Sequence, residues 1–169
     1  MSRTVLITGA SEGIGLEVAR QAVAQGDSVL MVAWGETKLR AAAAALGRPG
    51  SVEVAALDLS NAAALDGFLA QLDARGYLPD VLVNNAGQGV SGAFVDTDWA
   101  KIDQMLRVNM NAVACLSHWA ARGMKARGAG CIVNMSAAVA TRPVPYFAAY
   151  AASKAFVANS EAIRPGIPI

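Results

Sequence analysis

Charged residues and histidine are scarce in this chain of 169 residues, and their scarcity excludes several classes of protein. Only 16% of the residues are charged and the formal net charge is +1, so no surface for nucleic acid is expected. His118 is the single histidine, and the two cysteines, Cys115 and Cys131, lack metal-ligand spacing. We therefore expect no metal site and two buried free thiols, which are typical of a reducing compartment.

Long apolar runs are also missing, although 54% of the residues are hydrophobic. No uninterrupted run approaches the ~18 residues that a membrane span needs. The apolar run after Arg3 breaks at Thr8-Gly9, which is unlike a signal peptide. These absences predict a cytoplasmic protein without a membrane partner. The high apolar fraction predicts a single domain over residues 1–169 rather than a disordered chain.

Short β-branched runs alternate with helical patterns along the chain, which predicts an α/β fold with a parallel sheet. The runs are apolar on both faces, as in a doubly wound sheet that helices cover on both sides. Strands are expected at residues 4–8, 28–33, 51–57, 80–84 and 131–135. Helices are expected at 13–25, 36–46, after a cap at 60 or 61, from a cap at 97 or 98 to 124, and from about 148 to about 163. Two prolines after Arg164 predict an irregular tail from about residue 164.

The glycine-rich stretch TGASEGIG, residues 8–15, joins the first expected strand to the first expected helix. Glycine allows the backbone to approach a ligand, and the start of a helix offers free N–H groups to a pyrophosphate. A tight turn with close helix packing would need the same glycines. We nevertheless expect a dinucleotide site at this turn. Its candidate residues are Gly9, Ser11, Gly13, Ile14 and Gly15.

The fourth expected strand ends in Asn84-Asn85-Ala86-Gly87. In a sheet with the order 3-2-1-4-5, strands one and four flank the switch point at which ligands bind. Small residues there would let an adenosine or a ribose approach the backbone, although an ordinary strand-to-loop turn is the alternative. Asn84, Ala86 and Gly87 are therefore candidate cofactor contacts.

Together these motifs resemble those of the short-chain dehydrogenase/reductase family. The matching pieces are TGASEGIG, Asp58 of LDLS, NNAG, Asn109 in the long helix, and the pair Tyr150 and Lys154 of YAASK. Their order and spacing agree with the family from residue 4 to about 164. The resemblance implies a Rossmann-like fold and hydride transfer between NAD or NADP and a small carbonyl or alcohol substrate.

The resemblance also implies roles for the polar residues. Tyr150 would be the general acid/base, and Lys154, one helical turn further on, would favour the phenolate and hold the nicotinamide ribose. Asn109 would support a water-linked proton relay to Lys154, and Asp58 would join the cofactor contacts. A chance pair on a helix surface is the alternative for Tyr150 and Lys154, and a helix-packing amide is the alternative for Asn109.

Three features depart from the family pattern. The serine expected about thirteen positions before the tyrosine is Ala137, and its neighbour Ser136 is the catalytic hydroxyl only if a bulge or the strand's end rotates it inward. Neither an acid at Ala33 nor an arginine at Trp34 is present, so poor discrimination between NAD and NADP is expected. Trp34 would stack on adenine or pack on the sheet edge, and Glu12 would disfavour a 2′-phosphate if it points inward. The chain also lacks the family's last two strands and substrate lid.

These observations predict an NAD(P)-dependent oxidoreductase whose activity is impaired by Ala137 and by the short C-terminal part. The alternatives are an inactive nucleotide-binding or oligomerising remnant of the family, and a structural partner of a full-length relative. The helices at 99–124 and 148–163 resemble those that pair into a four-helix bundle in this family. Because an exposed fifth strand also invites pairing, a homo-oligomer is expected.

Overall fold

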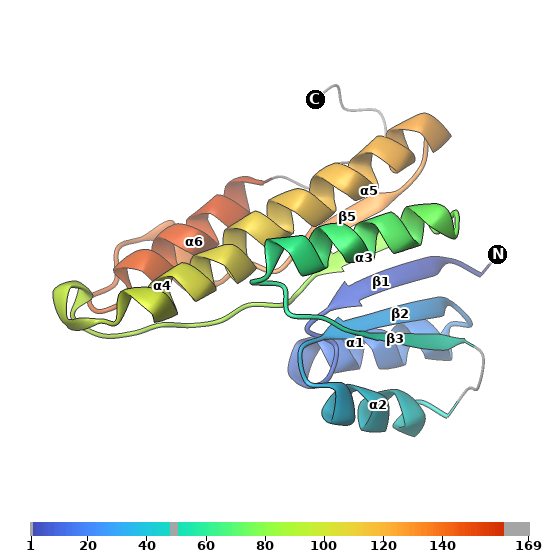
Figure 1. The fold of residues 1–169 in the computed structure, drawn as a ribbon, viewed down its shortest axis with the longest axis horizontal. Coiled ribbons are helices and arrows are strands. Elements are labelled where there is room, and N and C mark those ends of the chain that lie inside the picture. Colours follow the sequence, from blue (N-terminus) through green and yellow to red (C-terminus); the bar gives the residue numbers. More distant parts are fainter. Residues whose placement is uncertain (1, 48–50, 161–169) are drawn as a thin grey trace.

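Five parallel strands form one sheet in the computed structural model, which describes residues 2–47 and 51–160 (Figure 1). The strand order β3-β2-β1-β4-β5 confirms the predicted Rossmann-like order. The chain moves outward from β1 to β3 and then returns past β1 to β4, which places a switch point between β1 and β4. The strands are β1 (Thr4–Thr8), β2 (Ser28–Ala33), β3 (Val52–Ala56), β4 (Val81–Asn84) and β5 (Cys131–Asn134). The helices are α1 (Gly13–Ala24), α2 (Glu36–Ala45), α3 (Ala62–Ala74), α4 (Trp99–Leu106), α5 (Val113–Arg127) and α6 (Ala148–Asn159), with short turns η1 (Phe94–Asp96), η2 (Arg107–Ala112) and η3 (Ala138–Thr141).

Most predicted boundaries agree with these elements to within one or two residues. Asn61 rather than Ser60 caps α3, because its Oδ1 accepts the Ala64 amide at 3.1 Å. Asp98 rather than Thr97 caps α4. The predicted extension of the last helix to about residue 163 and the tail from about 164 lie outside the described residues. Within the described ranges there is no sixth strand, and no helix has the length and apolar character that a membrane crossing would require.

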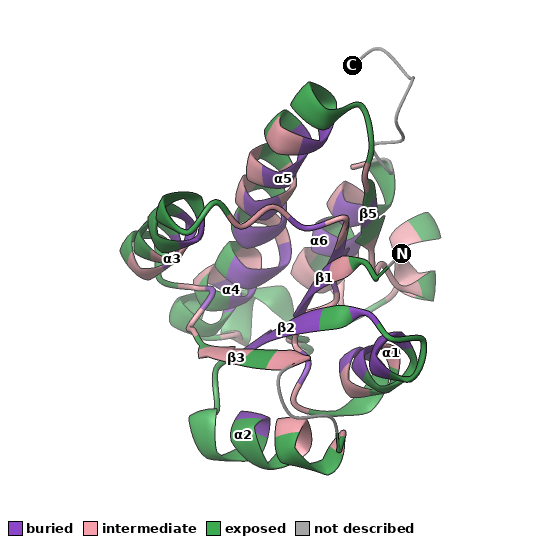
Figure 2. Cartoon of the chain, turned by 90° about the vertical axis from the view of Figure 1, so that its right-hand side faces the viewer, coloured by how far each residue is buried: buried purple, intermediate pink, exposed green. Residues whose placement is uncertain are grey.

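The sheet separates two apolar cores because successive strand residues point to opposite faces. Leu30 packs on the side of α3 and α5, whereas its neighbour Met31 packs on the side of α1 and α2. Figure 2 shows the buried residues of these helices on their sheet-facing sides. In β5 the same alternation leaves Ile132 buried and Val133 40% exposed. The β5 strand is therefore well covered on only one face.

The segment predicted as one long helix contains a π-helical turn. Residues Arg107–Ala112 (η2) separate α4 from α5, and the three parts follow one another without a break. The apolar spacing of the sequence did not reveal this turn, because one inserted residue hardly alters an amphipathic pattern. π turns are rare and often mark functional sites. Asn109 lies within it and is 1% exposed.

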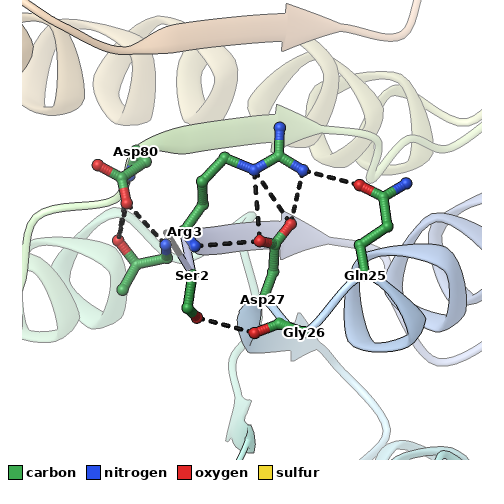
Figure 3. Close-up of polar contacts among 7 residues, drawn as sticks. Ser2, Arg3, Gln25, Gly26, Asp27 and Asp80 are labelled. Atoms are coloured by element: carbon green, nitrogen blue, oxygen red, sulfur yellow. Dashed lines mark hydrogen bonds and ion pairs between the residues drawn. The ribbon is translucent and has the colours of Figure 1, made fainter.

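Polar contacts hold the amino ends of the central strands together (Figure 3). The Arg3 guanidinium donates to both carboxylate oxygens of Asp27, the shortest N–O distance being 2.7 Å. Asp27 is only 3% exposed, and the hydrogen bond from Arg3 lowers the pKa of its carboxyl group. Asp80, before β4, accepts from the Thr4 amide at 2.7 Å. These contacts fix the strands at the end of the sheet opposite to the one where ligands of such folds bind.

Candidate active site

A cavity of about 470 Å³ lies at the carboxyl ends of the strands. This volume is typical of small-molecule sites. Because β2 and β4 flank β1, the cavity has a β2 side, formed by Glu12, Trp34 and Lys38, and a β4 side, formed by residues 85–88. The predicted cofactor contacts that line it are Gly9, Ser11, Trp34, Asp58, Ala86 and Gly87.

Six other predicted cofactor contacts do not line the cavity, and two of them, Tyr150 and Lys154, lie on α6. Gly13 and Ile14 begin α1, and Ile14 is 61% exposed. Gly15 is buried, and a Cβ there would lie 2.5 Å from the Asn85 side-chain nitrogen, so this glycine permits close packing of α1 on the β4 loop. Asn84 points elsewhere, as described below. The sequence motif therefore combines residues that line the cavity with residues that hold the turn in place.

Asn84 fastens β4 to its neighbours instead of facing the cavity. Its Nδ2 donates to Ser117 Oγ at 2.9 Å and to Asn134 Oδ1 at 2.8 Å. Asn134 in turn donates to the Ser160 carbonyl at 2.6 Å. Asn84 is 1% exposed. Since its Nδ2 bonds to α5 and β5, the buried side chain holds the sheet and does not line the cavity.

Thr8 and Asn85 were not among the predicted site residues; Asn85 lines the cavity, and Thr8 is buried beneath the loop after β4. Thr8 Oγ1 accepts from the amides of Asn85 at 3.1 Å and Ala86 at 3.0 Å. Asn85 Nδ2 donates to the carbonyls of Thr8 at 3.0 Å and Gly9 at 3.1 Å. These bonds fasten the loop after β4 to the glycine turn. The sequence did contain a signal for both residues, because a buried hydroxyl and a side-chain amide at the end of a strand both require hydrogen-bond partners.

The glycine turn fits a dinucleotide. Glu12 occupies the N-cap position of α1, yet its side chain makes no capping hydrogen bond, so no capping side chain occupies the first amides of the helix. Gly9 has φ +65°, and a Cβ there would lie 2.8 Å from Ala86 Cα. Only glycine fits this position without moving the β4 loop. Trp34 is 80% exposed and presents its ring at the β2 side, where an adenine ring could stack.

Lys154 and Gly87 meet at the β4 side of the cavity. Lys154, on α6, is 6% exposed, and its Nζ donates to the Met135 carbonyl at 2.9 Å. Burial lowers the pKa of this ammonium group. A Cβ on Gly87 would lie 3.1 Å from Nζ, so the loop passes directly against the lysine head group. Because Gly87 also lines the cavity, Lys154 lies just behind the cavity wall.

Asn109 connects the β4 loop to α6. Its Oδ1 accepts the Gln88 amide at 2.8 Å, and its Nδ2 donates to the Gln88 carbonyl at 2.9 Å and to Ser153 Oγ at 3.0 Å. Ser153 Oγ donates to the Tyr150 carbonyl at 2.7 Å. The predicted residues Asn109, Tyr150 and Lys154 are thus brought together, although none of them lines the cavity itself. The oxygen and the nitrogen of the Asn109 side chain thus hold the β4 loop against α6.

Tyr150 is half-buried beside the β4 loop. Its ring lies 6.0 Å from that of Phe147, and a Cβ on Gly89 would be 4.0 Å from it. Ser136, which lies beyond the end of β5, donates its hydroxyl to the Lys154 carbonyl at 2.7 Å. Ala137 follows with an extended backbone. The structure therefore places Ser136 against the backbone of α6, and Ala137 supplies no hydroxyl.

Comparisons with known proteins show the family of this chain. Residues 3–160 match the model of the short chain dehydrogenase family. EphD of Mycobacterium tuberculosis, named "Probable oxidoreductase", is 34% identical over 153 residues, which cover 89% of this chain and 26% of that protein. The chain spans between about a quarter and six tenths of the length of the curated relatives that it matches.

Two solved structures contain nicotinamide dinucleotides. A 4-hydroxyisoleucine dehydrogenase complexed with NADH has a TM-score of 0.86 and 26% identity, and the match covers 94% of this chain and 65% of that one. A metagenomic short-chain oxidoreductase in complex with NADP has a TM-score of 0.86 and 36% identity, with 94% and 71% covered.

Proposed function

Because this chain belongs to the short chain dehydrogenase family, we propose that it is an oxidoreductase that uses NAD or NADP on a small carbonyl or alcohol substrate. One observation carries the proposal. Gly87 lines the cavity that begins at the glycine turn, and the same residue lies against Lys154, one helical turn from Tyr150. A nucleotide site and a proton-transfer site therefore share a wall. The bound cofactor would supply hydride transfer, which no side chain can perform.

The proposed cofactor contacts follow from the lining of the cavity. The glycine turn and the first amides of α1 would hold the pyrophosphate. Asp58 and Trp34 would contact the adenosine, and Ala86 and Gly87 would allow a ribose to approach the backbone. Related structures with NADH and with NADP support a nicotinamide dinucleotide. The uncharged Ala33 and Trp34 support weak discrimination between the two.

The proposed proton carrier is the phenol of Tyr150. A free tyrosine has a pKa of about 10, so the phenolate must be stabilised for proton transfer near neutral pH. A cationic Lys154 would provide this stabilisation, and its bond to the Met135 carbonyl holds the head group in place. Asn109 would position both partners by joining the Gln88 backbone to α6.

Ala137 is the specific reason to keep a second candidate function. A second hydroxyl donor to the reacting oxygen is absent at Ala137, and the Ser136 hydroxyl is engaged with the Lys154 carbonyl. Losing one such donor typically lowers turnover by ~10²–10³. The chain would then be a weak enzyme or, as the second candidate, a nucleotide-binding remnant without turnover.

We also propose a homo-oligomer in a reducing compartment such as the cytoplasm. Large apolar side chains are exposed near the start of α4, among them Val95 at 89% and Trp99 at 64%. Such residues are typical of contact surfaces. Cys115 and Cys131 are free thiols, which suits a reducing compartment. The expectation that both are buried is wrong, because Cys131 is exposed at the start of the edge strand β5 and Cys115 is only partly buried. Light scattering at micromolar concentration tests the assembly, and a monodisperse monomer would contradict it.

The proposed activity is tested by following NADH and NADPH oxidation with a panel of aldehydes and ketones. Turnover that disappears in Tyr150→Phe, while the cofactor still binds, would support the enzyme. Cofactor binding without turnover on any substrate would select the remnant. Failure to bind either cofactor would contradict both candidates.

A further inference from the structure

A buried serine, Ser153, lies between Tyr150 and Lys154 on α6 and was not among the predicted site residues. The residue is 0% exposed, so both hydrogen bonds of its hydroxyl lie inside the protein. Ser153 Oγ accepts from Asn109 Nδ2 at 3.0 Å and donates to the Tyr150 carbonyl at 2.7 Å. An amide nitrogen only donates and a carbonyl only accepts, so the directions of both bonds are fixed. The hydroxyl therefore bridges the π turn η2 and the first turn of α6.

This bridge also settles the orientation of the Asn109 amide. Its Nδ2 donates one N–H group to the Gln88 carbonyl and the other to Ser153, while its Oδ1 accepts the Gln88 amide at 2.8 Å. Turning the amide over would place like groups of Asn109 and Gln88 against each other. Without the Ser153 hydroxyl, one N–H group of a side chain that is 1% exposed loses its partner, which is costly inside a protein. Ser153 therefore completes the contacts that hold Asn109 in place.

The loop that Asn109 holds is the part of the cavity wall that lies against Lys154. Gly87 immediately precedes Gln88 and lines the cavity. A Cβ on Gly87 would lie 3.1 Å from Lys154 Nζ and 3.4 Å from Asn109 Oδ1, so the three groups are in close contact. The position of the β4 loop relative to Lys154 therefore depends on the contacts of Asn109, and through them on Ser153.

Resting on the proposed oxidoreductase function, we propose that Ser153 is a positioning residue for proton transfer. Its hydroxyl holds Asn109 in one orientation and ties the helical turn that carries Tyr150 to the π turn. Ser153 does not line the cavity, so it acts through Asn109 and the backbone of α6. Its removal should let the β4 loop and α6 shift relative to each other. A displacement of about 1 Å in a catalytic site lowers turnover by up to ~10².

Hydrogen exchange of the Gln88 amide tests the positioning without substrate or cofactor, because this amide bonds to Asn109 Oδ1. NMR on the full chain should show that Ser153→Ala accelerates this exchange about tenfold. Ser117→Ala is the matched control, because Ser117 Oγ accepts from Nδ2 of another buried asparagine, Asn84, at 2.9 Å. It should leave the exchange of Gln88 unchanged, and urea unfolding of each variant shows that both are folded.

A double-mutant cycle separates positioning through Asn109 from a general loss of packing. In the Asn109→Ala background, Ser153→Ala should add little to the exchange rate of Gln88, because the partner of its hydroxyl is already gone. If Ser153→Ala has its full effect in that background, it acts independently of Asn109, and the proposal is overturned. An unchanged exchange rate in the single variant Ser153→Ala would overturn it as well.

Turnover gives the second readout, measured at saturating cofactor with the best substrate of the aldehyde and ketone panel. Ser153→Ala should lower kcat about tenfold and leave the Kd of NADH unchanged, because Ser153 does not line the cavity. Ser117→Ala should change neither quantity. A wild-type kcat in Ser153→Ala, or equal losses in the two variants, would overturn the proposal and leave the proposed function intact. If the wild-type chain turns over no substrate, the proposed function fails, and a role of Ser153 in proton transfer fails with it.

Discussion

The β2 side and the β4 side of the cavity differ in what holds their groups in place. On the β2 side, Trp34, Glu12 and Lys38 are largely exposed, and no capping side chain occupies the first amides of α1. On the β4 side, buried Asn109 and Lys154 are fixed by hydrogen bonds to backbone carbonyls and amides. Under the proposed function, nucleotide binding would therefore depend mainly on the backbone, whereas proton transfer would depend on a few positioned side chains. Binding and turnover should therefore be separable by mutation.

The largest expected effect comes from Tyr150→Phe. Removing the phenol should lower turnover by at least ~10³, which lies within the range of general acid/base catalysis. The dissociation constant of NADH should change little, because Tyr150 does not line the cavity. Steady-state kinetics and a cofactor titration measure the two quantities on the same preparation. Equal losses of binding and turnover would contradict the separation of the two sides.

The next effect concerns Ala137. Ala137→Ser restores a hydroxyl to the position that the family resemblance indicates, and turnover should rise by up to ~10². Ser136→Ala is the matched control and should change turnover little, because the Ser136 hydroxyl faces the Lys154 carbonyl. If Ser136→Ala is as damaging as Tyr150→Phe, then Ser136 is the catalytic hydroxyl.

Both sides of the cavity depend on the central strand β1, whose amino end is held by Arg3 and Asp27. Asp27→Asn should lower the free energy of unfolding by about 2 kcal/mol at pH 7, since it removes charge-assisted hydrogen bonds to a buried carboxylate. Urea denaturation measures this change, and Glu53→Gln, which removes an exposed partner of Arg75, is the control expected to matter little.

The effect of Asp27 should also depend on pH. Because Arg3 lowers the pKa of Asp27 in the folded chain, its stabilisation is fully present above the unfolded value of about 3.9. It is lost as the pH falls through the lower folded pKa. The difference between wild type and Asp27→Asn should therefore shrink as the pH falls below about 4. A difference that grows toward acid pH would contradict this reasoning.

The smallest expected effect tests the β2 side alone. Trp34→Arg places a guanidinium at the end of β2, where it matches the geometry of a phosphate, and should shift the binding preference toward NADPH by about tenfold. Tyr150-dependent turnover with saturating cofactor should stay the same. A wild-type chain that already prefers NADPH by ~100-fold would contradict the expected weak discrimination.

The sequence predicted the sheet well because the strands are short, mainly apolar segments that end in turns; β3, which contains Glu53, is the least apolar of them. The order β3-β2-β1-β4-β5 was confirmed, whereas the roles of Asn109, Tyr150 and Lys154 stay predictions. These features rest on local patterns and on a motif whose spacing is characteristic of the family. The turn chemistry also sufficed to place Asn61 among the candidate caps.

Other features of the structure could not be predicted from local sequence patterns, and most of them depend on contacts between distant segments. The π-helical turn around Asn109 leaves the apolar pattern almost unchanged. The direction of Asn84 is decided by Ser117 and Asn134, which are 33 and 50 positions away. The pairing of Lys38 with Glu12 likewise requires the fold to bring α2 against the glycine turn.

The central claim is that a nicotinamide dinucleotide binds between the glycine turn and the β4 loop. A fluorescence titration with NADH tests it most directly, because Trp34 lies at the edge of the cavity and can transfer energy to the bound nicotinamide. The wild-type chain should show saturable transfer at micromolar NADH, and Trp34→Phe should bind NADH with a diminished signal because Trp99 and Trp119 do not line the cavity. The absence of saturable binding at millimolar NADH and NADPH would contradict the account.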